Sequence, residues 1–423
     1  MSQEKTSKHS IKVPKLYKVA TSILKDFKNG QGSIKTLVYD ARKKHPNVKA
    51  LLALVNECVR YENRLLNAFN DVDLLKNEKP LDQSLALILA TELLIGKKTL
   101  PGESKPILTL LRYQSTLEKS FHSEKNVNEK DEIEHTKFAR YVRVNLLKTT
   151  LDLVLTHFKR EGLTLKDTPD AYDEFCKEVV NLKEDEFMID FHLKDYLLIF
   201  PPKTQFYDYP LYLDGSLVLQ DKASCLTVAA LNPTPGKIIL DACAAPGMKT
   251  SQALAMVQPE GKVIAIERNA KRFKVLNELL QKHSEWSEDA IETKNADFLQ
   301  LNPEDFSNVE YLIVDPTCSG SGLSKVEKDP VRLSKLANLQ VMILKHALKF
   351  PSLKRVAYST CSIFEEENEA VVEEVLKQHG DQFKLVNVLP TWERRTMNDK
   401  CLRVDPDKDL TSGFFVAVFK KKK

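Results

Sequence analysis

The first part of the chain carries apolar side chains at helical spacing. Within residues 13–28 the large apolar residues recur three and four positions apart, which predicts a one-sided helix. The patterns within residues 48–66 and 85–95 are similar. We therefore expect a helical domain over residues 1–120. A linker is expected over residues 121–135, where few large apolar side chains stand among mixed charges.

The apolar pattern changes after this linker. Residues 140–144 and 196–200 predict strands, and residues 150–160 predict a helix between them. We expect a small αβ subdomain over residues 136–215. A generic insert that only packs on the next domain would give the same pattern, so its role stays open.

Residues 216–423 alternate short apolar runs with helical patterns. The runs predicted to be strands are 237–240, 262–266, 311–314, 355–358 and 413–419. Such alternation is typical of a mostly parallel sheet with helices on both faces. We therefore predict a doubly wound α/β fold for this part of the chain.

The turn after the first of these runs, residues 241–250, has the sequence Asp-Ala-Cys-Ala-Ala-Pro-Gly-Met-Lys-Thr. At the carboxyl end of a strand, such a turn presents N–H groups and a helix N-terminus to a nucleotide-like ligand. It has one glycine, Gly247, and therefore lacks the spacing of a dinucleotide site. The next strand ends in Glu267, where an acid can accept hydrogen bonds from both ribose hydroxyls. An adenosine ligand without a pyrophosphate cradle is indicated.

Two later strands also end in reactive residues. The run 311–314 continues into Asp315-Pro-Thr-Cys318, and the run 355–358 continues through Ser-Thr into Cys361. Because the carboxyl ends of parallel strands meet at one edge of a sheet, we expect the acid and both thiols to lie close together there. A lone cysteine at a strand end is most often a small buried hydrophobe, but two beside an adenosine turn favour chemistry.

These motifs resemble the signatures of the Nop2/Sun (NSUN) family of RNA cytosine-C5 methyltransferases. The resemblance extends over roughly residues 140–419, and residues 32–39 are similar to the family's fifth animal member, which acts on large-subunit ribosomal RNA. One departure is Thr317, where the family usually has proline or serine. The stretches that carry the resemblance, all in family order, are 220–224, 243–249, 315–322, 358–362, 366–368 and 413–417.

The resemblance implies S-adenosylmethionine as the cofactor and an S-adenosylmethionine methyltransferase sheet preceded by an RNA-recognition-like αβ subdomain. It assigns Cys361 as the nucleophile and Cys318 to product release, with Asp315 and Lys249 as further catalytic residues and no metal. The residues expected to line the cofactor pocket are Cys243, Ala244, Ala245, Pro246, Gly247, Met248, Lys249, Glu267, Arg272, Asp297 and Asp315.

Cytosine C5 is a poor nucleophile, and this explains the need for two thiols. A thiolate that adds to C6 turns C5 into a carbon that can attack the sulfonium methyl of the cofactor. An acid such as Asp315, protonated or sharing a proton, can relieve the charge that develops at N3. The C5 proton must then leave and the first cysteine must be eliminated, steps in which a second thiol or thiolate near C5 is useful.

The two cysteines are expected to differ in their surroundings. The spacing from Ser362 to Glu365 matches a capping box, which predicts a helix over residues 365–378 whose N-terminus would acidify Cys361. The three acids at the start of that helix oppose the effect. Cys318 precedes two glycines, which predict a loop mobile enough to close over a substrate.

Composition narrows the classes of function. The chain has 423 residues, of which 42% are hydrophobic and 29% charged, as in ordinary soluble proteins. No apolar run approaches the ~20 residues that span a membrane, and the polar start is not typical of a signal peptide. The seven scattered cysteines include no C-x-x-C pair, which argues against a disulfide framework or a zinc cluster. We expect an intracellular protein.

Positive charge gathers at the front of the chain, with a local excess of nine over residues 1–60. This favours a polyanionic partner, although solvated helix faces would look the same. With the resemblance, we expect RNA as the partner, large-subunit ribosomal RNA above all, with no membrane contact, a monomer, and a nuclear and nucleolar location. The alternatives are an RNA-binding assembly factor without catalysis and a methyltransferase for transfer RNA. An NAD-dependent dehydrogenase is disfavoured because the turn lacks the required glycines.

Overall fold

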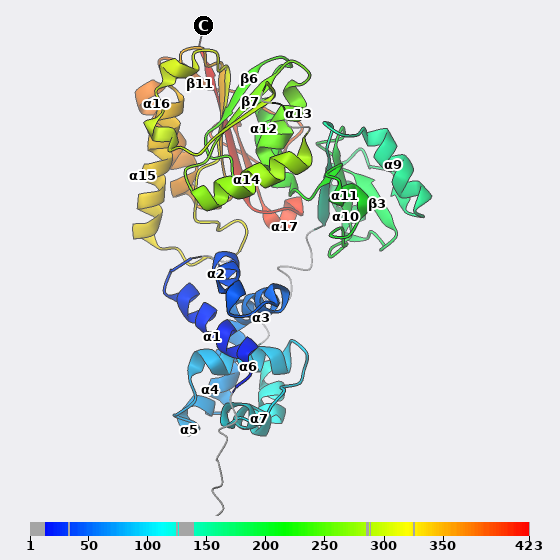
Figure 1. Cartoon of the computed structure of the whole chain (residues 1–423), viewed down its shortest axis with the longest axis vertical. Helices are drawn as coiled ribbons and strands as arrows, with labels where there is room; N and C mark the ends of the chain where they lie inside the picture. The colour runs from blue at the N-terminus through cyan, green and yellow to red at the C-terminus, as the bar shows by residue number, and fades with distance from the viewer. Residues whose placement is uncertain are drawn as a thin grey trace, which may run out of the picture. The chain divides into compact units, whose positions relative to one another are not determined.

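The computed structural model describes residues 13–32, 34–123, 126, 139–284, 287, 289–324 and 326–422. The chain forms two compact units, Met1–Thr136 and Lys137–Lys423, each of which is described by itself (Figure 1). Most of the expected linker over residues 121–135 falls outside the described residues.

The first unit is helical, as predicted. Its centre is α6, in which residues 86–94 are all buried, because this helix is apolar on every side. Helix α1 instead buries one face, and two lysines of its polar face form ion pairs, Lys25 with Asp82 at 2.7 Å and Lys28 with Glu62. The helices are α1 (Lys15–Lys28), α2 (Ile34–Asp40), η1 (Ala41–Lys43), α3 (Val48–Arg60), α4 (Glu62–Asp71), α5 (Leu74–Asn77), α6 (Gln83–Leu94) and α7 (Lys105–Phe121).

The second unit begins with a five-stranded sheet in the order β2-β3-β4-β1-β5. All four residues of β4 are buried, so both faces of the sheet are covered at its centre. The last strand, β5, extends this sheet to residue 218, beyond the predicted end of the αβ subdomain at residue 215. The elements are β1 (Arg140–Val144), α9 (Leu151–Arg160), β2 (Thr164–Lys166), α10 (Tyr172–Val180), β3 (Glu186–Ile189), β4 (Leu197–Phe200), α11 (Pro210–Leu213) and β5 (Leu217–Val218).

A nine-stranded sheet follows, with the path β12-β13-β14-β10-β9-β6-β7-β8 and β11 paired to β14. Strands β8, β7, β6, β9 and β10 run parallel, and β14 is antiparallel to β10. The strands are β6 (Ile238–Asp241), β7 (Lys262–Ile266), β8 (Ile291–Lys294), β9 (Tyr311–Val314), β10 (Arg355–Thr360), β11 (Phe383–Leu385), β12 (Arg395–Thr396), β13 (Cys401–Val404) and β14 (Phe414–Lys421).

Helices cover both faces of this sheet, which confirms the predicted doubly wound fold (Figure 1). Helices α12 (Lys222–Leu231), α13 (Met248–Val257) and α14 (Ala270–His283) pack on one face, and α15 (Pro330–Ala347) and α16 (Glu369–His379) pack on the other. Successive residues of the central strands therefore enter different cores, as Ile239 and Leu240 do in β6. The remaining short helices are η2 (Phe298–Gln300), η3 (Pro303–Phe306), η4 (Glu365–Glu367) and α17 (Pro406–Asp409).

The connection order places a switch point at β6. The chain passes from β6 to β7 on one side, and later returns to β9 on the other side. In such sheets the crevice for a ligand lies outside the carboxyl ends of the strands at this point. None of the helices that the structure describes combines the length and apolar character needed to cross a membrane.

Candidate active site

The turn after β6 brings the main chain close to α14. Gly247 has φ +110°, a conformation that side chains with a Cβ rarely adopt. A Cβ there would also lie 3.0 Å from Leu276 Cδ1 and 3.3 Å from Leu279 Cδ2. The next residue begins α13, so the free N–H groups of that helix face the turn. The single glycine of the motif is thus required by both backbone conformation and packing.

Asp241, the last residue of β6, is a site residue that the sequence analysis missed. Thr250 donates a hydrogen bond of 2.7 Å to its Oδ2, whereas its buried Oδ1 has no hydrogen-bond partner in the described part of the chain. Burial raises the pKa of Asp241 to about 6, opposed by the Thr250 bond and helped by Asp315. An unsatisfied buried carboxylate oxygen beside a turn suits a ligand with N–H donors. The position of Asp241 at the end of a predicted strand was the only feature of the sequence that pointed to it.

Glu267 and Arg272 lie against the same turn. Glu267 is only 4% exposed, and its Oε1 accepts a hydrogen bond of 2.8 Å from the N–H of Asn269. Arg272 contacts both Glu267 and the turn. Its Nη1 lies 3.5 Å from Glu267 Oε2, and its Nη2 donates a hydrogen bond of 2.5 Å to the carbonyl of Ala245. Asp297 follows the neighbouring strand β8, where it caps η2. The carboxyl ends of β6, β7 and β8 thus carry an acid each.

Asp315, directly after β9, forms an ion pair with Lys249 of α13. The distance from Lys249 Nζ to Asp315 Oδ2 is 2.9 Å, and Ser359 Oγ donates to Asp315 Oδ1 at 2.7 Å. Lys249 Nζ also donates to Ser224 Oγ at 3.1 Å and lies 5.4 Å from the ring centre of Phe414. Burial disfavours the charged amine, but Asp315, with smaller contributions from Asp241 and Cys361, outweighs burial, so the pKa of Lys249 is raised. The proton that Asp315 was expected to share is therefore one that the Lys249 ammonium donates to it.

The thiols of Cys318 and Cys361 meet with their sulfur atoms 3.0 Å apart, and both cysteines are free. The hydrogen bond from Cys318 lowers the pKa of Cys361, although burial opposes this. The same bond, together with burial, raises the pKa of Cys318 well above its usual range. The two pKa shifts favour Cys361 as the thiol that ionises first and Cys318 as the thiol that keeps its proton.

The helix expected to acidify Cys361 begins later than predicted. In place of one helix over residues 365–378, η4 comes first and α16 starts at Glu369. Ser362 Oγ accepts from the N–H of Phe364 at 3.1 Å and so does not cap a helix three residues on. The neighbouring thiol, and not a helix N-terminus, is the first cause of the low pKa of Cys361.

The loop that carries Cys318 is tied down at one end. The N–H of Gly322 donates to the carbonyl of Cys361 at 3.0 Å, and the N–H of Gly413 donates to the carbonyl of Gly322 at 2.9 Å. A Cβ on Gly322 would lie 1.9 Å from the carbonyl oxygen of Gly413. The expectation that both glycines make the loop mobile is wrong for Gly322. This glycine instead allows the main chain of the loop to pack closely against the main chain at Gly413. Gly320, with φ +74°, has open space around it.

Three protein-family models together match most of the chain. Residues 228–420 match the family described as 16S rRNA methyltransferase RsmB/F. Residues 138–220 match the ferredoxin-like domain of NOL1/NOP2/Sun domain family member 5, and residues 49–133 match the N-terminal domain of the same family member.

Similar proteins extend along the full length. A 28S rRNA (cytosine-C(5))-methyltransferase of Mus musculus is 38% identical, with 96% of this chain and 91% of the relative covered. Its counterpart in Drosophila melanogaster is 37% identical, with 98% of each chain covered. A crystal structure of a methyltransferase homolog protein from Pyrococcus horikoshii has a TM-score of 0.55 and 23% identity, covering 74% of this chain and 97% of its own.

Proposed function

Because this chain belongs to the NOL1/NOP2/Sun domain family, we propose that it transfers a methyl group from S-adenosylmethionine to C5 of a cytosine in large-subunit ribosomal RNA. The observation that carries the proposal is the contact of two thiols, Cys318 and Cys361, 3.0 Å apart beside the ion pair of Lys249 and Asp315. A thiolate nucleophile, a second thiol and a proton donor are the groups that this reaction requires.

The acidic residues at the ends of β6, β7 and β8 fit the cofactor. Glu267 would accept hydrogen bonds from the ribose hydroxyls, and the unsatisfied Oδ1 of Asp241 is suited to an amino group or positive charge. Arg272 holds Glu267 and the turn together. When bound, S-adenosylmethionine supplies the methyl group.

Cys361 acts first in the proposed reaction. As the thiolate of the pair, its sulfur forms a bond to cytosine C6, and the displaced electron pair increases the electron density at C5 and N3. The Lys249 ammonium, held by Asp315, stabilises the charge that develops near N3. The target base has to be unstacked or flipped to reach the sheet edge where these groups lie.

Cys318 acts after the methyl transfer. Its hydrogen bond to Cys361 is the first cause of its raised pKa, and this cause disappears once the sulfur of Cys361 is bonded to carbon. Burial still raises the pKa of Cys318, but with its first cause gone the thiol can give its proton to water, and the resulting thiolate takes the proton from C5. The C6–S bond breaks as the double bond re-forms, and Cys361 leaves as a thiolate.

The proposed substrate is supported by the names of the relatives. The mouse and fly proteins bear the names of large-subunit ribosomal RNA methyltransferases. These names support ribosomal RNA as the substrate over transfer RNA. We further propose that the enzyme is a monomer of the nucleus and nucleolus that meets its RNA naked or in pre-ribosomes. The intact thiol pair argues against an assembly factor that lacks catalysis.

Bisulfite sequencing of total RNA from cells with and without the protein tests the substrate. We expect one cytosine of large-subunit ribosomal RNA to lose its 5-methyl group when the protein is absent. Re-expression of the wild type should restore the methyl group, and Lys249→Met should not. A change confined to transfer RNA would contradict the proposed substrate.

Trapping tests the roles of the two thiols. Cys318→Ala should complete addition and methyl transfer but stall before release, so that a covalent protein–RNA complex accumulates with S-adenosylmethionine and survives denaturing electrophoresis. Cys361→Ala should give no such complex, and neither should the double variant. Complexes in Cys361→Ala alone would reverse the roles of the two cysteines.

A further inference from the structure

Glu367, at the end of η4, holds the main chain after Cys318 directly and the main chain before Cys318 through Gln340. Its side chain is fully buried, and Oε1 accepts hydrogen bonds from the N–H of Ser319 at 2.9 Å and from Gln340 Nε2 at 3.0 Å. The same Gln340 amide donates to the carbonyl of Thr317 at 3.1 Å. Thr317 and Ser319 are the two neighbours of Cys318 in the chain, so this carboxylate fixes the backbone that carries the thiol.

Asn368, the next residue, does the same for Cys361. Its fully buried side chain accepts a hydrogen bond of 2.5 Å from Thr360 Oγ1 and donates one of 2.9 Å from Nδ2 to the carbonyl of Ser362. Thr360 and Ser362 are the two neighbours of Cys361. One side chain therefore spans the nucleophile from the residue before it to the residue after it.

These contacts give Glu367 and Asn368 the same kind of role. We propose that Glu367 and Asn368 are positioning residues, one for each thiol, and that their adjacency in the chain sets the 3.0 Å contact between Cys318 and Cys361. The proposal rests on the function and thiol roles proposed above. Tyr358 anchors the pair, because its hydroxyl donates to the carbonyl of Glu367 at 2.5 Å.

The expected effects differ for the two residues because they act on different steps. A reacting group displaced by about 1 Å loses on the order of a hundredfold in rate. Loss of the Glu367 side chain should therefore slow release, which needs Cys318. Loss of the Asn368 side chain should slow addition to C6, which needs Cys361.

The experiment measures covalent complex formation and turnover with full-length protein, S-adenosylmethionine and a large-subunit ribosomal RNA substrate. Glu367→Ala should accumulate the covalent complex while forming it at a rate within about threefold of wild type, and turnover should fall on the order of a hundredfold. Glu367→Gln keeps an oxygen that can accept both hydrogen bonds and should restore turnover. Asn368→Ala should form the complex on the order of a hundredfold more slowly, including in a Cys318→Ala background.

Glu366→Ala is the matched control. Glu366 stands beside Glu367, but its side chain is partly exposed and pairs with Lys328 at 2.6 Å. This variant should keep wild-type turnover and show no accumulated complex. If Glu367→Ala does not fold, Gln340→Met removes the amide bonds to Thr317 and Glu367 at nearly constant volume, and should also accumulate the complex.

The outcomes separate this inference from the proposed function. If Cys318→Ala accumulates a complex and Cys361→Ala does not, the thiol roles stand. If Glu367→Ala and Asn368→Ala then lose addition and release equally, the two residues are merely structural and the inference is wrong. If neither cysteine variant shows the expected pattern, the proposed thiol roles themselves fail.

Discussion

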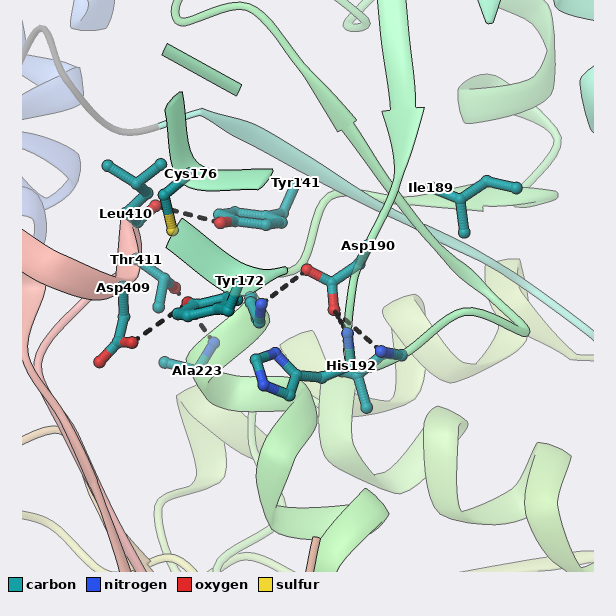
Figure 2. Close-up of polar contacts among 12 residues, drawn as sticks. Tyr141, Tyr172, Cys176, Ile189, Asp190, His192, Ala223, Asp409, Leu410 and Thr411 are labelled. Atoms are coloured by element: carbon teal, nitrogen blue, oxygen red, sulfur yellow. Dashed lines mark hydrogen bonds and ion pairs between the residues drawn. The ribbon is translucent and has the colours of Figure 1, made fainter. Parts of the chain in front are cut away.

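Lys222 and Asp190 form an ion pair that is buried completely between the αβ subdomain and the first helix of the methyltransferase domain. Lys222 Nζ lies 2.8 Å from Asp190 Oδ2, and both side chains have no exposed surface. The rings of Tyr172, Phe175 and Trp392 have their centres 5.4 to 5.6 Å from the ammonium. Figure 2 shows Asp190 beside Tyr172 and His192 in this cluster.

Lys222→Met should destabilise the protein by about 3 kcal/mol, the lower end of the range for breaking a buried ion pair. The lower end applies because the other oxygen of Asp190 keeps hydrogen bonds of 2.9 Å from the N–H groups of His192 and Leu193. Asp190→Asn should cost a similar amount, since it leaves the ammonium unpaired. The double variant buries no charge, so its loss should not exceed that of either single variant.

The measurement is urea unfolding at pH 7.5, followed by tryptophan fluorescence. The chain has two tryptophans. A Trp286→Phe background therefore leaves Trp392, which is 1% exposed and borders the ion pair, as the sole probe of this cluster. We expect a coupling energy of about 3 kcal/mol between the two substitutions. Additive losses, or a loss below about 1 kcal/mol for Lys222→Met, would refute the reasoning.

Three further predictions concern other parts of the chain. Burial, followed by repulsion from nearby cations, lowers the pKa of His283 to about 3. Since the unfolded chain binds this proton below about pH 6.5, the contribution of His283 to stability should fall by about 2 kcal/mol from pH 7.5 to 5.0. In urea titrations at both pH values, the loss of stability in His283→Phe should be smaller than in the wild type by this amount. Gly322→Ala, whose Cβ would collide with Gly413, should lower the unfolding free energy by about 3 kcal/mol, and an unchanged melting temperature would contradict this. Replacing Lys15 and Lys18 by glutamate should weaken RNA binding and flatten its salt dependence by roughly 0.7 to 0.9 per lost phosphate contact, measured by filter binding.

The choice of Lys15 and Lys18 follows from the structure. The sequence presents four lysines on one face of α1 as equivalent, but Lys25 and Lys28 are bound to acids within the helical unit. Reversing their charge would break those ion pairs, so a loss of RNA binding could then reflect damage to the fold. Helical spacing shows which residues share a face, whereas their partners come from other helices.

The parts of the site that could be predicted from the sequence depend on local structure. The turn at 241–250 follows from an apolar strand, a glycine and a helical pattern that are adjacent in the chain, and the structure has β6, Gly247 and α13 there. Asp241 was missed because its importance comes from burial and from an oxygen without a partner, which are properties of the folded core. Ser224 and Ser359 lie in stretches that carry the family resemblance but had no predicted role, since they matter through Lys249 and Asp315.

The cause of the lowered pKa of Cys361 could not be predicted from neighbouring residues in the sequence. A nearby helix N-terminus was the local candidate, but the first cause is Cys318, 43 residues away in the chain. Cys318→Ala should therefore raise the pKa of Cys361, because burial and Asp315 are then opposed only by Lys249 and a backbone hydrogen bond. Alkylation of the Cys361 peptide by iodoacetamide, followed by mass spectrometry across pH, should show a midpoint shifted upward, with Glu366→Ala as the unshifted control. An unchanged midpoint would mean that Cys318 does not lower the pKa of Cys361 and would favour the helix N-terminus as the cause. The proposal that the pKa of Cys318 falls after addition would then have no support.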